Sequence, residues 1–129
     1  MALAVKNVST WRRKALELFP DLRDEIQSPE MSIYQVFFEL VPRCREAHER
    51  GDVAELKRIY GFAEWCAKQR SKDLSNASGV AFCEHLADSN RTLEAIPQWV
   101  SKSVFDDIAG LLEAQVGPER VAQLRRQYE

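Results

Sequence analysis

Helix-forming residues make up half of this chain. Alanine, leucine, glutamate, glutamine, lysine and arginine together account for 64 of its 129 residues, and all of them have a high intrinsic helix propensity. Threonine occurs only twice, and glycine and proline together occur ten times. A β-sandwich or β-barrel needs many β-branched and turn-forming residues, so the composition predicts an all-α protein.

The length of the chain indicates one domain, spanning residues 1–129. A domain of this size buries about two-thirds of the surface of its unfolded chain, so it can form a core without disulfides or a metal. No apolar run approaches the ~20 residues that span a bilayer. Only five residues precede the first charge, Lys6, which is too short for the apolar region of a signal peptide. We therefore expect a cytoplasmic protein without membrane contact.

Proline marks the first helix boundaries. A helix that begins after Ser9 or Thr10 has apolar residues at steps of three and four, and Pro20 is expected to split or kink it. Ser28-Pro29-Glu30 has the pattern of a helix start, with a cap, a proline and an acid. The next helix is expected from about Pro29 to Arg50. Its apolar phase persists past Pro42, which predicts a kink there and no break.

Gly51-Asp52 predicts a tight connection between two antiparallel helices. Gly51 suits the left-handed position after a helix, and Asp52 with Glu55 suits the cap of the next. That next helix, about residues 53–71, is apolar on several sides, which is typical of a central helix. We expect Phe62, Ala63 and Cys66 to be buried in it, with a second phenylalanine, Phe82, packed nearby.

The C-terminal half continues in short helices. Residues 73–87 show no clean apolar stripe but are rich in small residues, including Gly79, which indicates close helix packing. A short helix is expected at 90–96, stopped by Pro97, then one after Ser101 or Ser103, and one after Gly117-Pro118. The predicted fold is an antiparallel bundle or a short solenoid-like (armadillo- or HEAT-like) array of about six helices.

Thiol and imidazole groups form the first candidate site. Cys44 and His48 are four residues apart on one helix face, whereas Cys83 and His85 are two apart and point in different directions. A metal site or a Cys–His nucleophile that also uses Cys66 is one interpretation. The spacing matches no zinc motif, and cysteine packs as a small hydrophobe. We therefore expect core packing, with no metal and no cofactor.

The second candidate is a surface formed by Glu64, Trp65, Glu84 and His85. Glu84 lies near an apolar helix face, where a carboxylate must be paired, shifted in pKa or exposed in a cleft. Glu64 meets it if the helices at 53–71 and 73–87 are antiparallel, and paired carboxylates can perform acid–base catalysis. An exposed Trp65 would be typical of a protein-binding hot spot. The alternative interpretation is structural hydrogen bonds or ordinary surface acids.

Motifs for nucleotide and nucleic-acid chemistry are missing. The sequence contains no G-x-G-x-x-G, Walker loop, H-E-x-x-H or G-x-S-x-G pattern. Its densest basic run is Arg12-Arg13-Lys14, which acidic residues follow closely, and the net charge is −2. A dedicated nucleic-acid binder is more basic than this. A nucleic-acid accessory role for these three residues is the weakest of the functions considered.

Several segments resemble small bacterial helical domains of uncharacterised function. They are Ala47–Asp52, Ile59–Cys66, Asn76-Ala77, Phe82–Leu86 and Ile96–Ser101, within roughly residues 30–110. The resemblance implies a helical, armadillo-like or solenoid-like domain and carries no established activity. Similar proteins include partner-binding and toxin-neutralising proteins. We therefore expect a non-catalytic module whose partner is another protein. The alternative is a small metal-dependent or acid–base enzyme with its site between the helices at 53–71 and 73–87.

Overall fold

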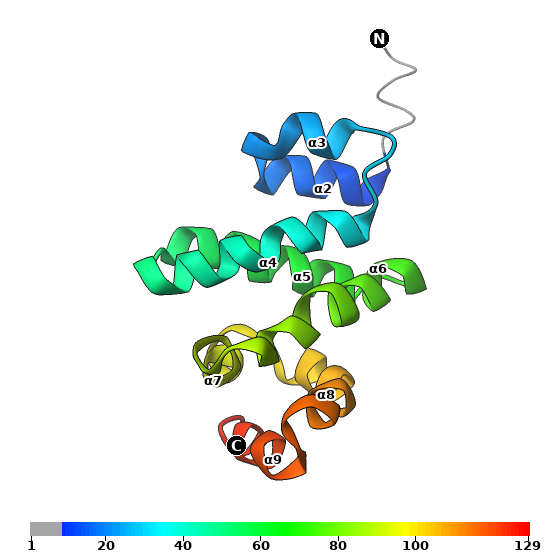
Figure 1. The fold of residues 1–129 in the computed structure, drawn as a ribbon. Coiled ribbons are helices and arrows are strands. Elements are labelled where there is room, and N and C mark those ends of the chain that lie inside the picture. Colours follow the sequence, from blue (N-terminus) through cyan, green and yellow to red (C-terminus); the bar gives the residue numbers. More distant parts are fainter. Residues whose placement is uncertain (1–8) are drawn as a thin grey trace.

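Eight α-helices and three short segments of other helical geometry make up the described part of the chain, residues 9–129, in a computed structural model (Figure 1). Residues 1–6, on which the signal-peptide argument rests, lie outside it. The elements are α2 (Thr10–Leu18), η1 (Pro20–Leu22), α3 (Arg23–Gln27), α4 (Ile33–Arg50), α5 (Val53–Ala67), α6 (Lys72–Ala77), η2 (Ser78–Phe82), η3 (Cys83–Asp88), α7 (Asn90–Trp99), α8 (Lys102–Val116) and α9 (Pro118–Arg126). The all-α prediction is confirmed. The α-helices of the described residues number eight and not about six, because the first predicted helix is divided into α2 and α3 and the short segment after Ser89 forms a full α-helix, α7.

The helices follow one another from one end of the molecule to the other. In Figure 1 the α2–α3 pair lies at the top, α4 and α5 lie beneath it, and α9 lies at the bottom. The order of contacts agrees, because α5 packs against α2, α4 and α6, whereas α9 packs against α7 and α8. The first and the last described helices, α2 and α9, accordingly lie at opposite ends.

The first helix is divided at Pro20, as predicted. α2 ends at Leu18, and Pro20 begins the 3-10 helix η1. Ser9 occupies the cap position, but its hydroxyl makes no capping hydrogen bond. The start expected at Pro29 is wrong: α4 begins at Ile33, after a capping box in which Ser32 and Gln35 bond each other's backbone N–H groups. Two reciprocal hydrogen bonds prevail over the proline signal.

Proline does not interrupt α4 or α7. α4 continues through Pro42, as predicted, and both Pro42 and Phe38 are exposed. Water can therefore reach the side of the helix on which the Phe38 carbonyl loses its usual donor. The predicted stop at Pro97 is wrong, since α7 continues to Trp99. Pro97 has no N–H to donate to the Leu93 carbonyl, so the helix lacks one hydrogen bond there and still continues for two residues.

The α4–α5 connection is the tight hairpin expected from Gly51-Asp52. Gly51 has φ 69°, in the left-handed region that glycine adopts without a Cβ clash. The Asp52 carboxylate accepts from the Glu55 N–H at 3.1 Å. The Glu55 side chain does not complete the box, because its oxygens accept from Arg43 and Arg58 instead.

Residues 72–88 are helical but not one α-helix. The predicted helix at 73–87 is instead α6, a π-helix (η2) and a 3-10 helix (η3), while α5 ends at Ala67, short of the expected position near residue 71. Ala77, Ser78, Gly79, Ala81, Phe82 and Cys83 are all buried. At 100° per residue these positions are distributed around the whole helix. Neighbouring elements therefore cover the segment on nearly every side. Its backbone changes from α-helix to π-helix and then to 3-10 helix.

Aromatic side chains join the elements in the core. Phe62 of α5 is 0% exposed, and its ring centroid lies 5.9 Å from that of Phe19 and 5.3 Å from that of Phe37. Phe37 also lies 5.8 Å from Phe82. Ala63 and Cys66 are buried as well. The predicted central position of this helix is therefore confirmed, with Phe82 packed close by through Phe37.

Candidate functional site

The structure does not bring the predicted surface residues together at one site. Each has different neighbours: Glu64, Trp65, Glu84 and His85. Glu64 is half-buried near Ser101, and a hydrogen bond from Ser101 together with Lys68 lowers its pKa. Trp65 is half-buried and stacks on Phe62, with ring centroids 6.4 Å apart. Trp65 therefore contributes mainly to the core.

Glu84 and His85 face other elements. The backbone carbonyl of Glu84 accepts from the Gln115 amide at 3.1 Å. The His85 ring lies 2.9 Å from a carboxylate oxygen of Asp88, which also accepts from Arg45. In the part of the chain that the structure describes, no hydrogen bond joins Glu64 and Glu84. The Glu64 carboxylate instead accepts from Lys68 at 3.2 Å, so the predicted pair of carboxylates is not formed there.

The region between α5 and η2–η3, where a catalytic site was the alternative, is filled by side chains. Tyr60, Glu64, Cys83 and Trp99 line a space of only about 10 Å³ there. That volume holds at most about one water molecule. Tyr60 stacks on Trp99 at a centroid distance of 5.4 Å, which closes the region further. The space is far smaller than the ~300–1,000 Å³ of small-molecule sites.

The three cysteines are buried and reduced. Burial raises the pKa of Cys44 to about 11 and those of Cys66 and Cys83 to about 12. A thiolate is the form that attacks substrates or binds metals, and burial disfavours that form at all three cysteines. Within residues 9–129, no group of three or more His, Cys, Asp or Glu side chains is arranged to hold a metal ion.

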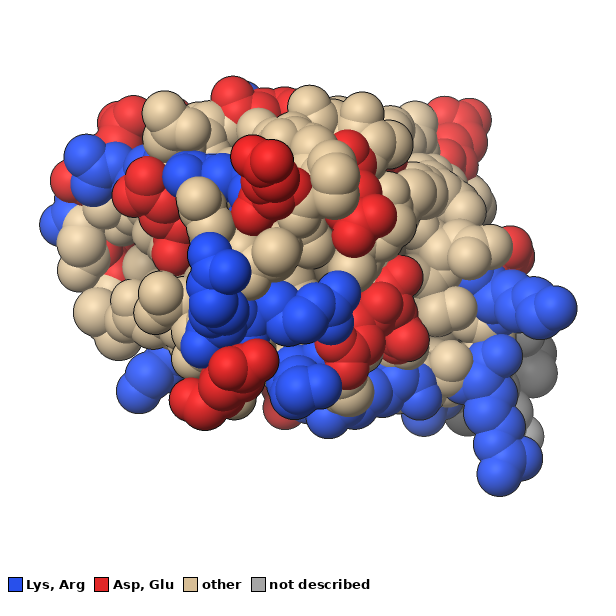
Figure 2. Space-filling view, turned by 90° about the horizontal axis from the view of Figure 1, so that it is seen from below, with Lys and Arg blue, Asp and Glu red and all other residues tan. Residues whose placement is uncertain are grey.

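Two residues of the basic run, Arg12 and Lys14, make contacts within the N-terminal helices and the loop that follows them. The Arg12 guanidinium donates to the backbone carbonyls of Ile26, Ser28 and Met31. Lys14 lies 3.9 Å from Glu17. Figure 2 shows acidic and basic side chains intermixed on the face seen from below. Neither observation favours nucleic-acid binding.

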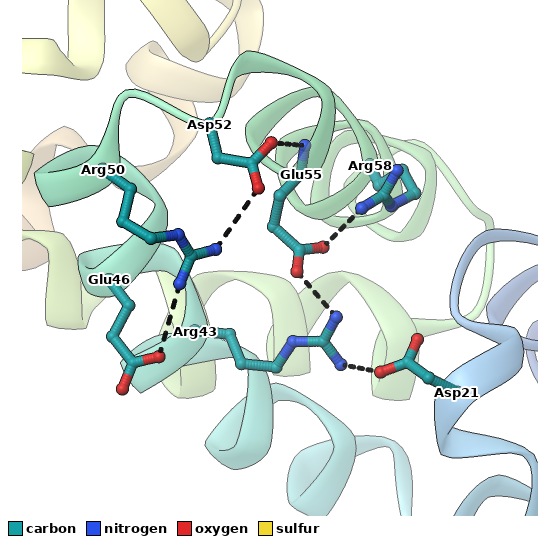
Figure 3. A network of polar contacts seen from close by, with 7 residues as sticks. All are labelled: Asp21, Arg43, Glu46, Arg50, Asp52, Glu55 and Arg58. Atoms are coloured by element: carbon teal, nitrogen blue, oxygen red, sulfur yellow. Dashed lines mark hydrogen bonds and ion pairs between the residues drawn. The ribbon is translucent and has the colours of Figure 1, made fainter.

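A network of charged side chains joins η1, α4 and α5 (Figure 3). The Arg43 guanidinium donates to Glu55 at 2.8 Å and to Asp21 at 2.9 Å, and Arg58 donates to the other oxygen of Glu55 at 3.2 Å. Glu55 is 8% exposed, and its charge is matched by both arginines. Arg50 extends the network to Asp52 at 3.3 Å. With its charges matched in this way, the network connects the N-terminal helices to the α4–α5 hairpin.

A surface groove that adjoins the core lies between α6–η2 and α8. Its volume is about 230 Å³. The apolar wall includes Val80, which is 39% exposed, while Asp107 is the one charged residue of the lining. The complete lining is Ala67, Ser75, Asn76, Ser78, Gly79, Val80, Val104, Asp107, Ile108 and Leu111.

The π-helix η2 forms one wall of this groove, and π-helical turns are frequent at functional sites. The Ser78 hydroxyl donates to the Ala63 carbonyl of α5 at 2.7 Å, which anchors η2 to α5. A Cβ at Gly79 would lie 3.7 Å from Leu111, an ordinary contact distance. η2 and α8 are therefore close together, but their spacing does not require glycine.

The sequence patterns do not predict this groove. The small residues of 77–81 indicate close packing, Val80 belongs to the apolar face near Glu84, and no pattern marks Asp107 as part of a site. A partial signal was present, because Val80 is an apolar residue in a segment that has no clean apolar stripe. The opposite wall lies about thirty residues away along the chain, and no local pattern links the two walls.

The fold and this groove define the chain as an all-α domain with an open surface groove and three buried, free cysteines in its core. It belongs to the DUF7674 family, a domain of unknown function, which matches residues 12–110. No curated protein and no solved structure matches the chain. Among the described residues, none of the helices combines the length and apolar character needed to cross a lipid bilayer.

Proposed function

We propose that the chain is a cytoplasmic, non-catalytic protein-interaction module, a solenoid-like helical array that binds a segment of another protein in the groove between η2 and α8. The groove itself is the observation that carries the proposal. Its volume of about 230 Å³ is below the ~300–1,000 Å³ of small-molecule and cofactor sites. That size suits one or two side chains of a partner segment.

The chemistry of the core supports binding over catalysis. The thiols are held in their protonated form by burial, and the space between α5 and η3 holds about 10 Å³. Neutralisation of a bacterial toxin is one form that such partner binding takes in similar helical proteins. The chain would then act by covering a surface of its partner.

Two exposed valines allow a matched test. Val80 borders the groove and is 39% exposed, whereas Val53 at the start of α5 is 51% exposed and lies outside it. In affinity capture from the native cells, the wild-type chain and Val53→Ser should recover the same partner. Val80→Ser should bind it about tenfold more weakly, a loss equivalent to about 1.4 kcal/mol. Capture that is insensitive to Val80→Ser would exclude the groove as the binding site.

A further inference from the structure

A single acidic side chain lines the groove. The lining residues lie between Ala67 and Leu111, and Asp107 is the one charged residue among them. Asp107 of α8 is exposed and lines the groove. Within residues 9–129 it makes no ion pair. The groove therefore presents a negative charge that the described part of the molecule leaves unpaired.

The neighbouring acid, Asp106, shows why the cations nearby do not reach Asp107. Lys102 lies 3.0 Å from one carboxylate oxygen of Asp106, and Arg125 lies 2.8 Å from the other. These pairs lower the pKa of Asp106. Lys102 and Arg125 are thus occupied by Asp106, which faces α9, whereas Asp107 lies on the side of α8 that faces η2.

The other groups of the lining specify the rest of a ligand. Val80, Ile108 and Leu111 provide apolar contact for an aliphatic side chain. Asn76 is exposed on the α6 wall, and its amide can bond the backbone of an incoming segment. The Ser78 hydroxyl is already used by the Ala63 carbonyl. A ligand that complements the groove therefore has an aliphatic side chain for the apolar residues and one cation for Asp107.

We infer that the groove selects a partner segment in which an aliphatic side chain stands next to a lysine or arginine, with the aliphatic group against Val80 and Leu111 and the cation facing Asp107. This inference rests on the proposed function and adds the chemistry of the partner. Opposite charges at an exposed site contribute modestly to affinity, about 0.2–1 kcal/mol, but like charges placed together exclude the wrong partner.

A charge exchange tests the inference. A phage-displayed library of random short peptides is selected on the wild-type chain, on Asp107→Lys and on Glu113→Lys, which makes the same charge change at an exposed position of α8 outside the groove. Wild type and Glu113→Lys should enrich peptides with Leu, Ile or Val beside Lys or Arg. Asp107→Lys should enrich Asp or Glu in place of the cation. An enriched peptide should bind Asp107→Asn about two- to fivefold more weakly than wild type.

Two further variants separate this inference from the proposed function. Gly79→Leu places a side chain in the groove. Val80→Ser changes an exposed residue at the edge of the groove and leaves the core side chains unchanged. Circular dichroism checks that both variants fold. Suppose that the wild type enriches peptides more than both variants do, but that the charge of the enriched peptides is the same for the wild type and for Asp107→Lys. The inference is then wrong and the proposed function stands. If the wild type enriches no peptides relative to Gly79→Leu and Val80→Ser, both are wrong.

Discussion

The surroundings of each cysteine decide its chemistry more than its spacing in the sequence does. Burial is the largest cause of the raised pKa at Cys44, Cys66 and Cys83 alike, and at Cys44 it outweighs the hydrogen bond with Tyr60 and the positive charge of Arg45. Burial therefore disfavours the thiolate in all three cases. The sequence suggested that these thiols pack as small hydrophobes, and their burial confirms that expectation.

We predict that none of the three thiols reacts with a chromogenic disulfide reagent in the native chain at about pH 8, because a raised pKa leaves little thiolate. All three should react at once when the chain is unfolded in denaturant. The absorbance of the released thiolate measures both. Rapid labelling of a single cysteine in the native chain would contradict the burial described here.

His48 is the second residue whose surroundings matter. Its Nε2 lies 2.8 Å from the Tyr60 hydroxyl, and its ring meets that of Trp99 edge to face. Burial, and then the positive charge of Arg91, lowers the pKa of His48 from its ordinary value of 6.5. The folded chain therefore resists protonation at this position more than the unfolded chain does.

This difference predicts a loss of stability in mild acid. As the pH falls through about 6.5, the unfolded chain takes up a proton at His48 before the folded chain does, so the free energy of unfolding decreases. Above about pH 7 this contribution is complete and constant. Urea denaturation from about pH 7.5 to pH 5.5 should show the decrease in the wild type and a smaller one in His48→Gln, which retains a hydrogen-bonding group. Equal slopes would show that His48 is not responsible.

At the scale of elements, the position of a glycine in its helix decides what glycine contributes. Gly51 ends α4 with φ 69°, and Gly61 lies in the middle of α5 with nothing within 4 Å of an added Cβ. The first needs a left-handed backbone, and the second does not. The same substitution should therefore have opposite effects at the two positions.

We predict that Gly61→Ala raises the free energy of unfolding by about 0.8–1 kcal/mol, the difference in helix propensity. Gly51→Ala should lower it by about 1–2 kcal/mol, because a Cβ is strained in the left-handed region. Chemical denaturation of both variants beside the wild type measures the difference. A stabilising Gly51→Ala would mean that the α4–α5 turn relaxes into another conformation.

At the scale of the whole molecule, one aromatic cluster holds several elements together. Phe62 lies against Phe19, which follows α2, and against Phe37 of α4, and it stacks on Trp65. Its removal would therefore affect the N-terminal helices and the central hairpin together. Phe38 of α4, which is 56% exposed, provides a control of the same residue type.

We predict that Phe62→Ala lowers the free energy of unfolding by about 3–5 kcal/mol, since it leaves a cavity in a packed core. That is a large part of the ~5–15 kcal/mol available to a domain. Phe38→Ala should change it by less than about 0.5 kcal/mol. The midpoint of urea unfolding reports both values. A small effect of Phe62→Ala would show that the surrounding side chains refill the space.

The sequence predicted helix boundaries correctly wherever a few adjacent residues determine the local structure. The break at Pro20, the hairpin at Gly51-Asp52, the cap at Ser101 and the start after Gly117 all depend on backbone geometry within one turn, and the structure confirms each of them. The all-α fold follows from the same cause summed over the chain, because half of the residues favour helix.

Only the tertiary structure decided the rest, because those features depend on neighbours distant in the sequence. Pro97 sits inside α7, and residues 78–88 leave the α-helix where α4, α5 and α8 surround them. Glu64 and Glu84 acquire separate partners for the same reason. The groove exists because η2 and α8 meet without filling the space between Val80 and Asp107, and that geometry arises only when the chain packs.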